Sequence, residues 1–300
     1  MTTIAITGAS GYVGGKILAC ARERGHRVIV VGRTPVAGTD FRFFDLADPK
    51  LLDLEGVQAV IHAAHDFSAS GPAIVERNLG GGEAVLESAI RAHARPVIVS
   101  TLSAFDGCRS RYGRVKRQLE ERWAAQGGII LRAGVVFGKD AGGIFGALRD
   151  VIRWTNIVPL VAPRSTPFYA TYDRSLADAL LNAATSNGSH PSSIALAANP
   201  EPFSFAHLIE HIASGTGRRI HLIPVPPHLA YLSLATAERL GITPPFRSDS
   251  VLSLLRPVPP DQLARLPLAD STFPPLDTLL WASDDKSHPS ESHVGPPTQP

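Results

Sequence analysis

The chain has 300 residues, a formal net charge of +2 and a 44% share of hydrophobic residues. This length and apolar content suffice for a large α/β core with a smaller second region. The weak net charge, with Lys and Arg scattered along the chain, predicts no nucleic-acid partner. Cys20 and Cys108 form neither a disulfide framework nor a metal-ligand spacing, which fits a reducing compartment.

The N-terminal residues and the length of the apolar runs predict the cellular location of the protein. The chain enters an apolar strand almost at its first residue, without a basic and apolar leader segment. No run is long and uncharged enough to span a bilayer. We therefore expect a soluble, cytoplasmic protein that acts on a small-molecule substrate and has no membrane partner.

A strand, a glycine turn and a helix open the chain. Residues 4–6 are apolar and predict a buried strand, residues 7–14 read TGASGYVG, and a helical pattern then ends at Gly25. A second apolar strand is predicted over residues 27–31. A flexible surface turn is the alternative interpretation, but this order of elements favours dinucleotide binding.

Each glycine of the turn has a distinct predicted role. Gly8 supplies a positive φ, Gly11 lets the backbone approach a ligand, and Gly14 lets the helix pack closely against the strand. Free amide groups at the start of the helix favour a pyrophosphate.

The end of the second strand indicates which dinucleotide is bound. An NAD-selective site has a carboxylate there for the ribose 2′-hydroxyl, whereas this chain has Gly32 followed by Arg33. A guanidinium group forms charge-assisted bonds with a 2′-phosphate. The sequence therefore favours NADP(H) over NAD(H), with an ordinary exposed arginine as the alternative.

Strands and helices alternate through the first half. The segments in chain order are strands over 41–44 and 59–64, a helix over 83–93, a strand over 97–101, a helix over 112–126 and a strand over 129–137. Such alternation predicts a Rossmann-type, doubly wound parallel sheet, with ligands at the carboxyl ends of its strands. We assign residues 1–140 to this NAD(P)-binding domain.

Residues 141–282 are expected to form a small, mostly helical substrate region. Ser175 and Asp178 predict a capping box for a helix over 176–184, Ser204 a cap for one over 205–213, and Pro227 the start of a third that ends at Gly241. The short apolar run 194–197 is expected to return to the main sheet, so that the two regions interleave. Residues 283–300 lack periodicity and predict a disordered tail.

Three polar side chains are candidates for catalysis. Thr101 ends a predicted strand, and Tyr112 and Lys116 lie four residues apart on the next helix, so they share one face. The ammonium group is expected to lower the pKa of the phenol, which exchanges a proton with a substrate oxygen held by the Thr101 hydroxyl. Ser100 and Ser103 are alternative hydroxyl donors. A solvated pair on an exposed helix is the other interpretation.

Together these motifs resemble the extended short-chain dehydrogenase/reductases of the NAD-dependent epimerase/dehydratase family. The turn resembles the family's nucleotide signature, and Asp45-Leu46 resembles the pair that contacts adenine. Asn78, before Gly80 and Gly81, resembles its helix-supporting asparagine motif. Tyr112 and Lys116 match its YxxxK. With Arg33 added, the residues expected to bind the cofactor are Gly8, Ser10, Gly11, Tyr12, Val13, Gly14, Arg33, Asp45, Leu46, His62, Ala63, Ala64, Tyr112, Lys116 and Val135.

Departures from the family pattern narrow the implied reaction. Sugar dehydratases have Asp and Glu after the hydroxyl residue, where this chain has Leu102 and Ser103, and Val135 replaces an asparagine usual in members acting on nucleotide sugars. The resemblance implies hydride transfer between NADP(H) and a carbonyl or alcohol substrate. A nucleotide-sugar epimerase or dehydratase, and a non-catalytic NADP(H)-binding sensor or assembly protein, are the alternatives.

Two further expectations concern metals and assembly. His62 and His65 lack a third ligand at a suitable position, so no metal site is expected. By analogy with the family, the helices predicted over 83–93 and 112–126 could form the contact of a homodimer.

Overall fold

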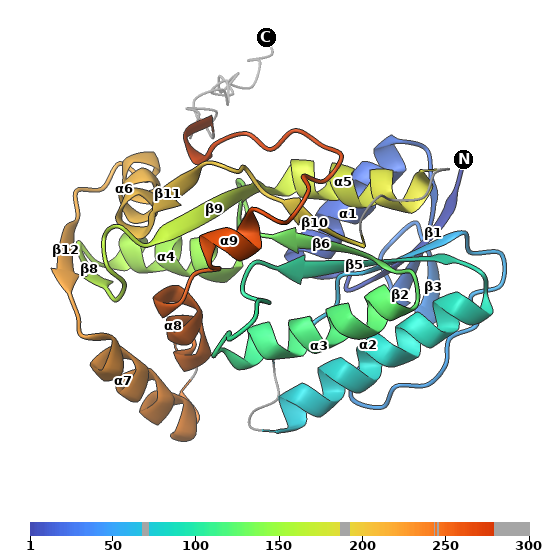
Figure 1. Ribbon diagram of the computed structural model, residues 1–300, viewed down its shortest axis with the longest axis horizontal. Coiled ribbons are helices and arrows are strands. Elements are labelled where there is room, and N and C mark those ends of the chain that lie inside the picture. Colours follow the sequence, from blue (N-terminus) through green and yellow to red (C-terminus); the bar gives the residue numbers. More distant parts are fainter. Residues whose placement is uncertain (68–71, 187–192, 243, 245, 279–300) are drawn as a thin grey trace, which may run out of the picture.

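The computed structural model describes residues 1–67, 72–186, 193–242, 244 and 246–278, so the predicted tail, 283–300, lies outside the described residues. A seven-stranded sheet forms its centre, in the order β3-β2-β1-β4-β5-β6-β10 (Figure 1). Every neighbouring pair in it is parallel, which confirms the predicted doubly wound fold. The strands are β1 (Thr3–Thr7), β2 (Arg27–Gly32), β3 (Asp40–Phe43), β4 (Ala59–His62), β5 (Arg95–Thr101), β6 (Ile129–Ala133) and β10 (Ile194–Ala197).

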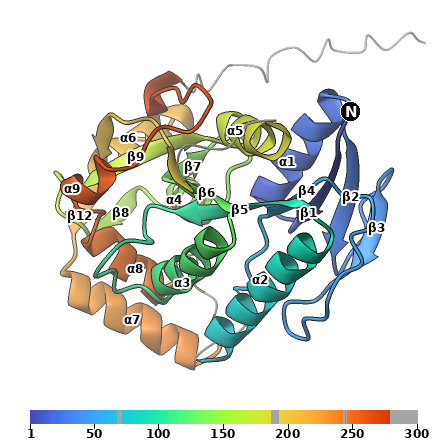
Figure 2. The same ribbon diagram turned by 45° about the vertical axis from the view of Figure 1, so that its right-hand side comes forward.

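Helices cover both faces of this sheet (Figure 2). The helices α1 (Tyr12–Glu23) and α5 (Asp173–Thr185) pack on one face. On the other face lie α2 (Ala73–Arg91) and α3 (Arg111–Ala125). Because both faces are covered, the central strands are apolar at successive positions. In β1, for example, Ile4 and Ile6 belong to the first core and Ala5 to the second.

A second region is built from short elements on the carboxyl side of the sheet. Its strands are β7 (Val135–Phe137), β8 (Ile157–Leu160), β9 (Pro167–Tyr172), β11 (Pro202–Ser204) and β12 (His221–Pro224), paired as β11-β9-β7 and β12-β8. Its helices are α4 (Gly143–Trp154), α6 (Phe205–Gly215), α7 (Pro227–Arg239), α8 (Ser248–Leu255), α9 (Pro260–Leu263) and the 3₁₀ helix η1 (Leu276–Thr278). Within the described ranges, no helix combines the length and apolar character needed to cross a bilayer.

Several predictions for this second region are confirmed. The run over 194–197 forms β10 and pairs in parallel with β6, so the chain does return to the main sheet. The Ser204 hydroxyl accepts a hydrogen bond from the His207 amide and caps α6. The helix α7 begins at Pro227 as expected, although it ends at Arg239, before Gly241.

The single strand predicted over 129–137 is wrong, because the chain breaks at Gly134. The strand β6 stays in the main sheet, while β7 pairs with β9 in the three-stranded sheet. A Cβ atom on Gly134 would lie 2.0 Å from the Tyr169 carbonyl oxygen, so only glycine allows this close crossing. The Gly134 amide instead donates to the Thr171 hydroxyl, at 2.8 Å. The break carries the chain from the cofactor half into the second region.

Two helix starts were also predicted wrongly. The helix α2 begins at Ala73, ten residues before the expected start, since the glycines over 80–82 are accommodated inside it. There a Cβ atom on Gly81 would lie 2.2 Å from Leu46 Cδ2, and one on Gly82 would lie 2.5 Å from Leu119 Cδ2. The helix α5 begins at Asp173, so Ser175 lies inside it and forms no capping box.

Candidate functional site

The glycine turn has the geometry that a dinucleotide site requires. Gly8 has a φ of 73°, and a Cβ atom there would lie 2.8 Å from the Ala64 backbone. At Gly14 a Cβ atom would lie 2.1 Å from the Gly8 carbonyl oxygen. The Gly11 amide donates to that same oxygen, at 2.9 Å. The turn therefore closes tightly on itself, and Gly8 and Gly14 both need to be glycine.

The start of α1 suits an anion. Gly11 is its N-cap, no side chain caps the first turn, and that turn has no acidic residue. Ser10 and Gly11 are exposed, while Val13 is half-buried. Uncapped amide groups at a helix N-terminus attract negative charge. The observed turn and helix start therefore fit the pyrophosphate of a dinucleotide.

The residues expected near the adenosine end lie beyond β2 and β3. Arg33 is exposed one residue after β2, and among the described residues no ion pair engages it. The Asp45 carboxylate accepts the Ala47 amide, at 3.0 Å. Leu46 packs against Gly81 of α2. A free cation therefore stands at the strand end where the sequence favours a 2′-phosphate.

His62 lies beneath this edge rather than on it. Its side chain is fully buried, its Nδ1 atom is 2.8 Å from the Thr7 hydroxyl, and its ring stacks on Trp123. Burial lowers the pKa of His62 to about 3, and the charge of Lys116 adds to the shift. The side chain of His62 thus belongs to the core, whereas Ala63 and Ala64 are partly exposed.

The start of α3 is held by two side chains. The Ser110 hydroxyl accepts the Gly113 amide, at 3.1 Å. The carboxylate of Asp249, in the first turn of α8, accepts the Arg111 amide at 2.7 Å and the Tyr112 amide at 3.0 Å. The second region therefore fixes the backbone of the predicted catalytic tyrosine.

Lys116 is buried one turn further along α3. Its ammonium group donates to the Val99 carbonyl of β5, at 2.8 Å. Burial lowers the pKa of Lys116 to about 8, and the carboxylate of Glu120 acts in the opposite direction. A lysine has three donor hydrogens, so this bond leaves two for other partners.

Tyr112 lies in an aromatic cluster. Its ring centroid is 4.9 Å from that of His65, edge to face, and 5.8 Å from that of Phe67. Burial raises the pKa of Tyr112 to about 12, and Glu120 adds to the shift. The expected lowering of the Tyr112 pKa is therefore wrong for this structure, because desolvation and the nearby carboxylate both raise that pKa.

The three candidate hydroxyl donors, Thr101, Ser100 and Ser103, differ in their burial and in their hydrogen bonds. Thr101 is the last residue of β5, largely buried, and its hydroxyl accepts the Ser103 amide at 3.1 Å. Ser100 is excluded as an alternative because its buried hydroxyl donates to Glu120, at 2.5 Å. Ser103 is half-buried, and its carbonyl oxygen lies against Gly113.

Sequence analysis missed the ion pair beneath this site. The carboxylate of Glu120 accepts from Arg132 on β6, at 2.9 Å from Nε and 2.7 Å from Nη2. The acid lies four residues after Lys116 on the same face of α3. That spacing was the available signal. The contributions of His65 and Asp249 depend on tertiary contacts that no local pattern reveals.

Tyr12 joins the glycine turn to the second region. Its hydroxyl donates to the buried carboxylate of Asp173, the first residue of α5, and burial followed by this bond raises the pKa of Tyr12. The Lys16 ammonium is 3.2 Å from the same carboxylate. Val135, also expected near the cofactor, is half-buried in β7 opposite Ala170.

Within the described residues, a group that could hold a metal ion lies elsewhere. His207 and His211, one turn apart on α6, approach Asp277 of η1. The Asp277 Oδ1 atom is 2.7 Å from His207 Nε2 and 3.4 Å from His211 Nδ1. This group belongs to the second region and not to the α3 edge.

Two comparisons by sequence match the first half of the chain or a similar share of it. The model of the "NAD dependent epimerase/dehydratase family" matches residues 4–142. A ceramide reductase from Caulobacter vibrioides is 31% identical over 147 residues, which are 45% of this chain and 46% of that protein. The match thus spans about half the length of that curated relative.

Solved structures share the fold. A UDP-glucose 4-epimerase from Thermotoga maritima, solved with UDP-glucose, has a TM-score of 0.63 at 18% identity and covers 84% of this chain and 97% of its own. A short-chain dehydrogenase/reductase superfamily protein from Agrobacterium tumefaciens, with bound NAD, has a TM-score of 0.62 at 20% identity, covering 84% and 95%. Residues 4–142 therefore carry the sequence pattern of the NAD-dependent epimerase/dehydratase family, and the solved structures have the same fold over 84% of the chain.

Proposed function

We propose that this protein is an NADP(H)-preferring oxidoreductase that reduces a carbonyl group on a small-molecule substrate. The observation that carries the proposal is that the half-buried Tyr112 and the buried Lys116 lie one turn apart on α3, with Lys116 bonded to Val99 near the carboxyl end of β5. The uncapped start of α1 and the free guanidinium of Arg33 support the choice of cofactor. The bound cofactor would supply the hydride to the carbonyl carbon.

The chain's own residues would handle the proton. The Thr101 hydroxyl orients the substrate oxygen, and Tyr112 donates a proton to it. A phenol whose pKa is about 12 stays protonated at neutral pH, which suits a proton donor better than a base. The Lys116 ammonium, with two free donor hydrogens, holds the nicotinamide ribose and stabilises the phenolate after transfer. In this proposal Tyr112 acts as the general acid of carbonyl reduction.

A nucleotide-sugar epimerase or dehydratase is the second candidate, because solved epimerases share the fold. Elimination needs an acid and a base beside the hydroxyl residue, and here Leu102, which is buried, follows Thr101. The match to a ceramide reductase instead favours a reductase. A non-catalytic sensor remains the third candidate.

Replacing Tyr112 tests the proposal. With NADPH and a panel of aldehydes, ketones and long-chain ketones, we expect Tyr112→Phe to lower kcat/KM by about 10²–10⁴-fold and to keep NADPH affinity. Tyr231→Phe, at an exposed tyrosine of α7, is the matched control and should retain activity. Unchanged turnover in Tyr112→Phe contradicts the mechanism. Tight NADPH binding by the unaltered protein without turnover of any carbonyl favours the sensor, and turnover of UDP-sugars favours the epimerase.

A further inference from the structure

The helix α7 has an unusually apolar exposed surface. Ala230 is the one residue of α7 that is buried. Leu229 and Leu232 are 52% and 60% exposed, and Tyr231 is also exposed. Single exposed apolar residues are ordinary, but neighbouring ones on one helix are not.

The apolar surface continues beyond the helix. The strand β12 leads into α7 and pairs with β8, so Ile223 and Ile157, both exposed, lie on the same small sheet. Trp154, 90% exposed, ends α4 three residues before Ile157. Both views place β8, β12 and α7 along one edge of the molecule (Figures 1 and 2). We call the exposed surface formed by Trp154, Ile157, Ile223, Leu229, Tyr231 and Leu232 the α7 face.

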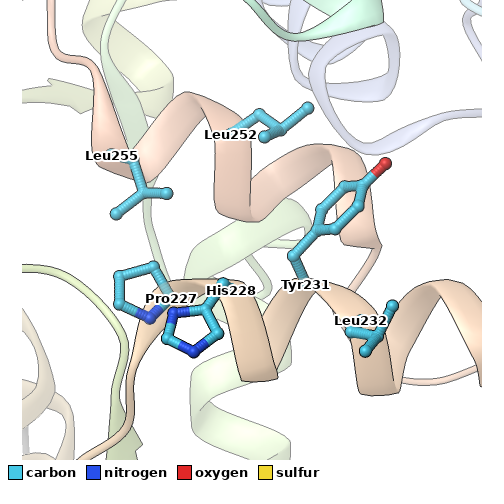
Figure 3. Close-up of a pocket in the computed structure, with 6 residues that line it drawn as sticks. All are labelled: Pro227, His228, Tyr231, Leu232, Leu252 and Leu255. Atoms are coloured by element: carbon cyan, nitrogen blue, oxygen red, sulfur yellow. The ribbon is translucent and has the colours of Figure 1, made fainter.

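A groove hollows this face where α7 meets α8. Figure 3 shows Pro227, His228, Tyr231 and Leu232 of α7 opposite Leu252 and Leu255 of α8, around a cavity of about 590 Å³. Flexible hydrocarbon chains can fill such a hollow, whereas a rigid protein surface needs a matching ridge.

Exposed arginines lie beside the Trp154 end of the α7 face. Two segments form it, 151–172 and 211–237, and neither contains Asp or Glu, although the chain has 27 of these residues in total. The same segments carry the exposed Arg153, Arg218 and Arg219. The Arg218 guanidinium donates to the Arg153 carbonyl, next to Trp154. Cations therefore lie next to Trp154, and the carboxylates of Asp150, Glu210 and Glu238 lie just outside these two segments along the chain.

We propose that the α7 face docks on an anionic membrane surface. Trp154, Leu229 and Leu232 would enter the boundary between headgroups and acyl chains, and the bordering arginines would contact lipid phosphates. The exposed Arg153, Arg218 and Arg219 favour this partner over a second copy of the chain, which would bring the same arginines together. The expectation of no membrane partner rested on the lack of a spanning segment, which does not bear on binding to a surface. The proposal does not depend on the reaction proposed above.

Vesicle binding by the full chain tests the proposal. We expect co-sedimentation with vesicles containing phosphatidylglycerol, and at least tenfold weaker binding to pure phosphatidylcholine or at high salt. The variant Leu229→Ser/Leu232→Ser should lose at least tenfold of the binding to anionic vesicles. Phe43→Ser, at an exposed apolar residue of the remote edge strand β3, is the matched control and should bind normally. Arg153→Gln/Arg219→Gln should flatten the salt dependence.

Three results would overturn the proposal. The first is that the unaltered protein does not bind anionic vesicles, and the second is that the leucine variant binds them as well as the unaltered protein does. The third is that light scattering finds the unaltered protein to be a dimer and the leucine variant to be a monomer. Circular dichroism and the unfolding midpoint of each variant show whether a loss of binding is specific, since the replaced side chains are exposed.

Discussion

Glu120 of α3 and Arg132 of β6 form a buried, two-bond ion pair directly beneath the proposed catalytic face. The Ser100 hydroxyl donates to the same carboxylate, so three elements meet at one side chain. Burial of two charges is unfavourable unless their hydrogen bonds are satisfied, and here they are. The pair fixes α3 against the sheet at the helix turn that follows Lys116.

Breaking this pair from one side should be costly. Arg132→Leu leaves the Glu120 carboxylate buried without its cation, and we expect the free energy of unfolding to fall by about 3–5 kcal/mol. Glu120→Leu/Arg132→Leu removes both charges and should recover a large part of that loss. Urea unfolding at pH 7 measures both variants. A double variant whose loss equals the sum of the single losses would show that the pair is not coupled.

The pH dependence of turnover should reveal Lys116. If its ammonium form is needed, kcat/KM should fall as pH rises above the pKa of about 8, by about tenfold per pH unit. Lys116→Arg keeps its charge to higher pH, so its profile should stay flat to about pH 10 whatever its absolute rate. Glu120→Gln removes the carboxylate that raises the Lys116 pKa and should move the descending limb to lower pH. An identical limb in all three proteins would exclude Lys116 as its origin.

Arg33 should discriminate between the two dinucleotides. A charge-assisted contact contributes about 1.5–3 kcal/mol, so its loss in Arg33→Ala should raise the Kd for NADPH roughly 10- to 150-fold. The Kd for NADH should change little. Arg42→Ala, at an exposed arginine of the neighbouring strand β3, is the control. Isothermal titration calorimetry of the unaltered protein and both variants with each cofactor gives the six dissociation constants needed. An equal loss for NADPH and NADH would contradict the assignment of NADP(H).

His62 should make the fold sensitive to acid. Its folded-state pKa is about 3 and an unfolded histidine has about 6.5, so below pH 6.5 the unfolded state binds the extra proton. Stability should therefore fall as pH decreases, by about 2 kcal/mol between pH 7 and pH 5 from this residue alone. His62→Gln should lose that part of the pH dependence, while His221→Gln, at an exposed histidine, should keep it. Parallel pH profiles for all three proteins would contradict the account.

Adjacent glycines of α1 provide a matched pair of tests. An added Cβ at Gly14 would lie 2.1 Å from the Gly8 carbonyl oxygen, whereas at Gly15 its nearest neighbour is 3.5 Å away. Gly14→Ala should therefore distort the turn and weaken binding of either dinucleotide at least tenfold. Gly15→Ala should bind normally and unfold at a slightly higher temperature, because alanine favours the helix by up to ~1 kcal/mol. Equal binding by both variants would show that the turn tolerates the added atom.

The first half of the fold could be predicted from the sequence because its local signals agree with its tertiary structure. Central strands such as β1, β4 and β5 are covered on both faces and therefore appear as plain apolar runs. The small strands β8, β9, β11 and β12 each contain a proline, which normally argues against a strand. Their pairing over only a few residues depends on the core packed behind them. The glycines over 80–82 likewise argue against a helix in the sequence, although packing against Leu46 and Leu119 accommodates them inside α2.

The candidate site could be predicted only in part. The spacing of Tyr112 and Lys116 is local, and so is the glycine turn. The protonation of Tyr112 depends on its desolvation and on Glu120, which no spacing rule measures. Ser100 and Thr101 are neighbours of similar chemistry, yet β-strand alternation sends one hydroxyl to Glu120 and leaves the other at the strand end.

Two hydrogen bonds between the Asp249 carboxylate and the first amides of α3 link the second region to the proposed catalytic helix. Any occupant that shifts α8 pulls on the backbone of Tyr112 through two hydrogen bonds, across 137 positions of the sequence. Changes far out in the substrate region would therefore alter the rate of the chemical step as well as affinity. The evolution of a new substrate selectivity is then constrained, because each substitution in α8 must keep the Tyr112 hydroxyl in position.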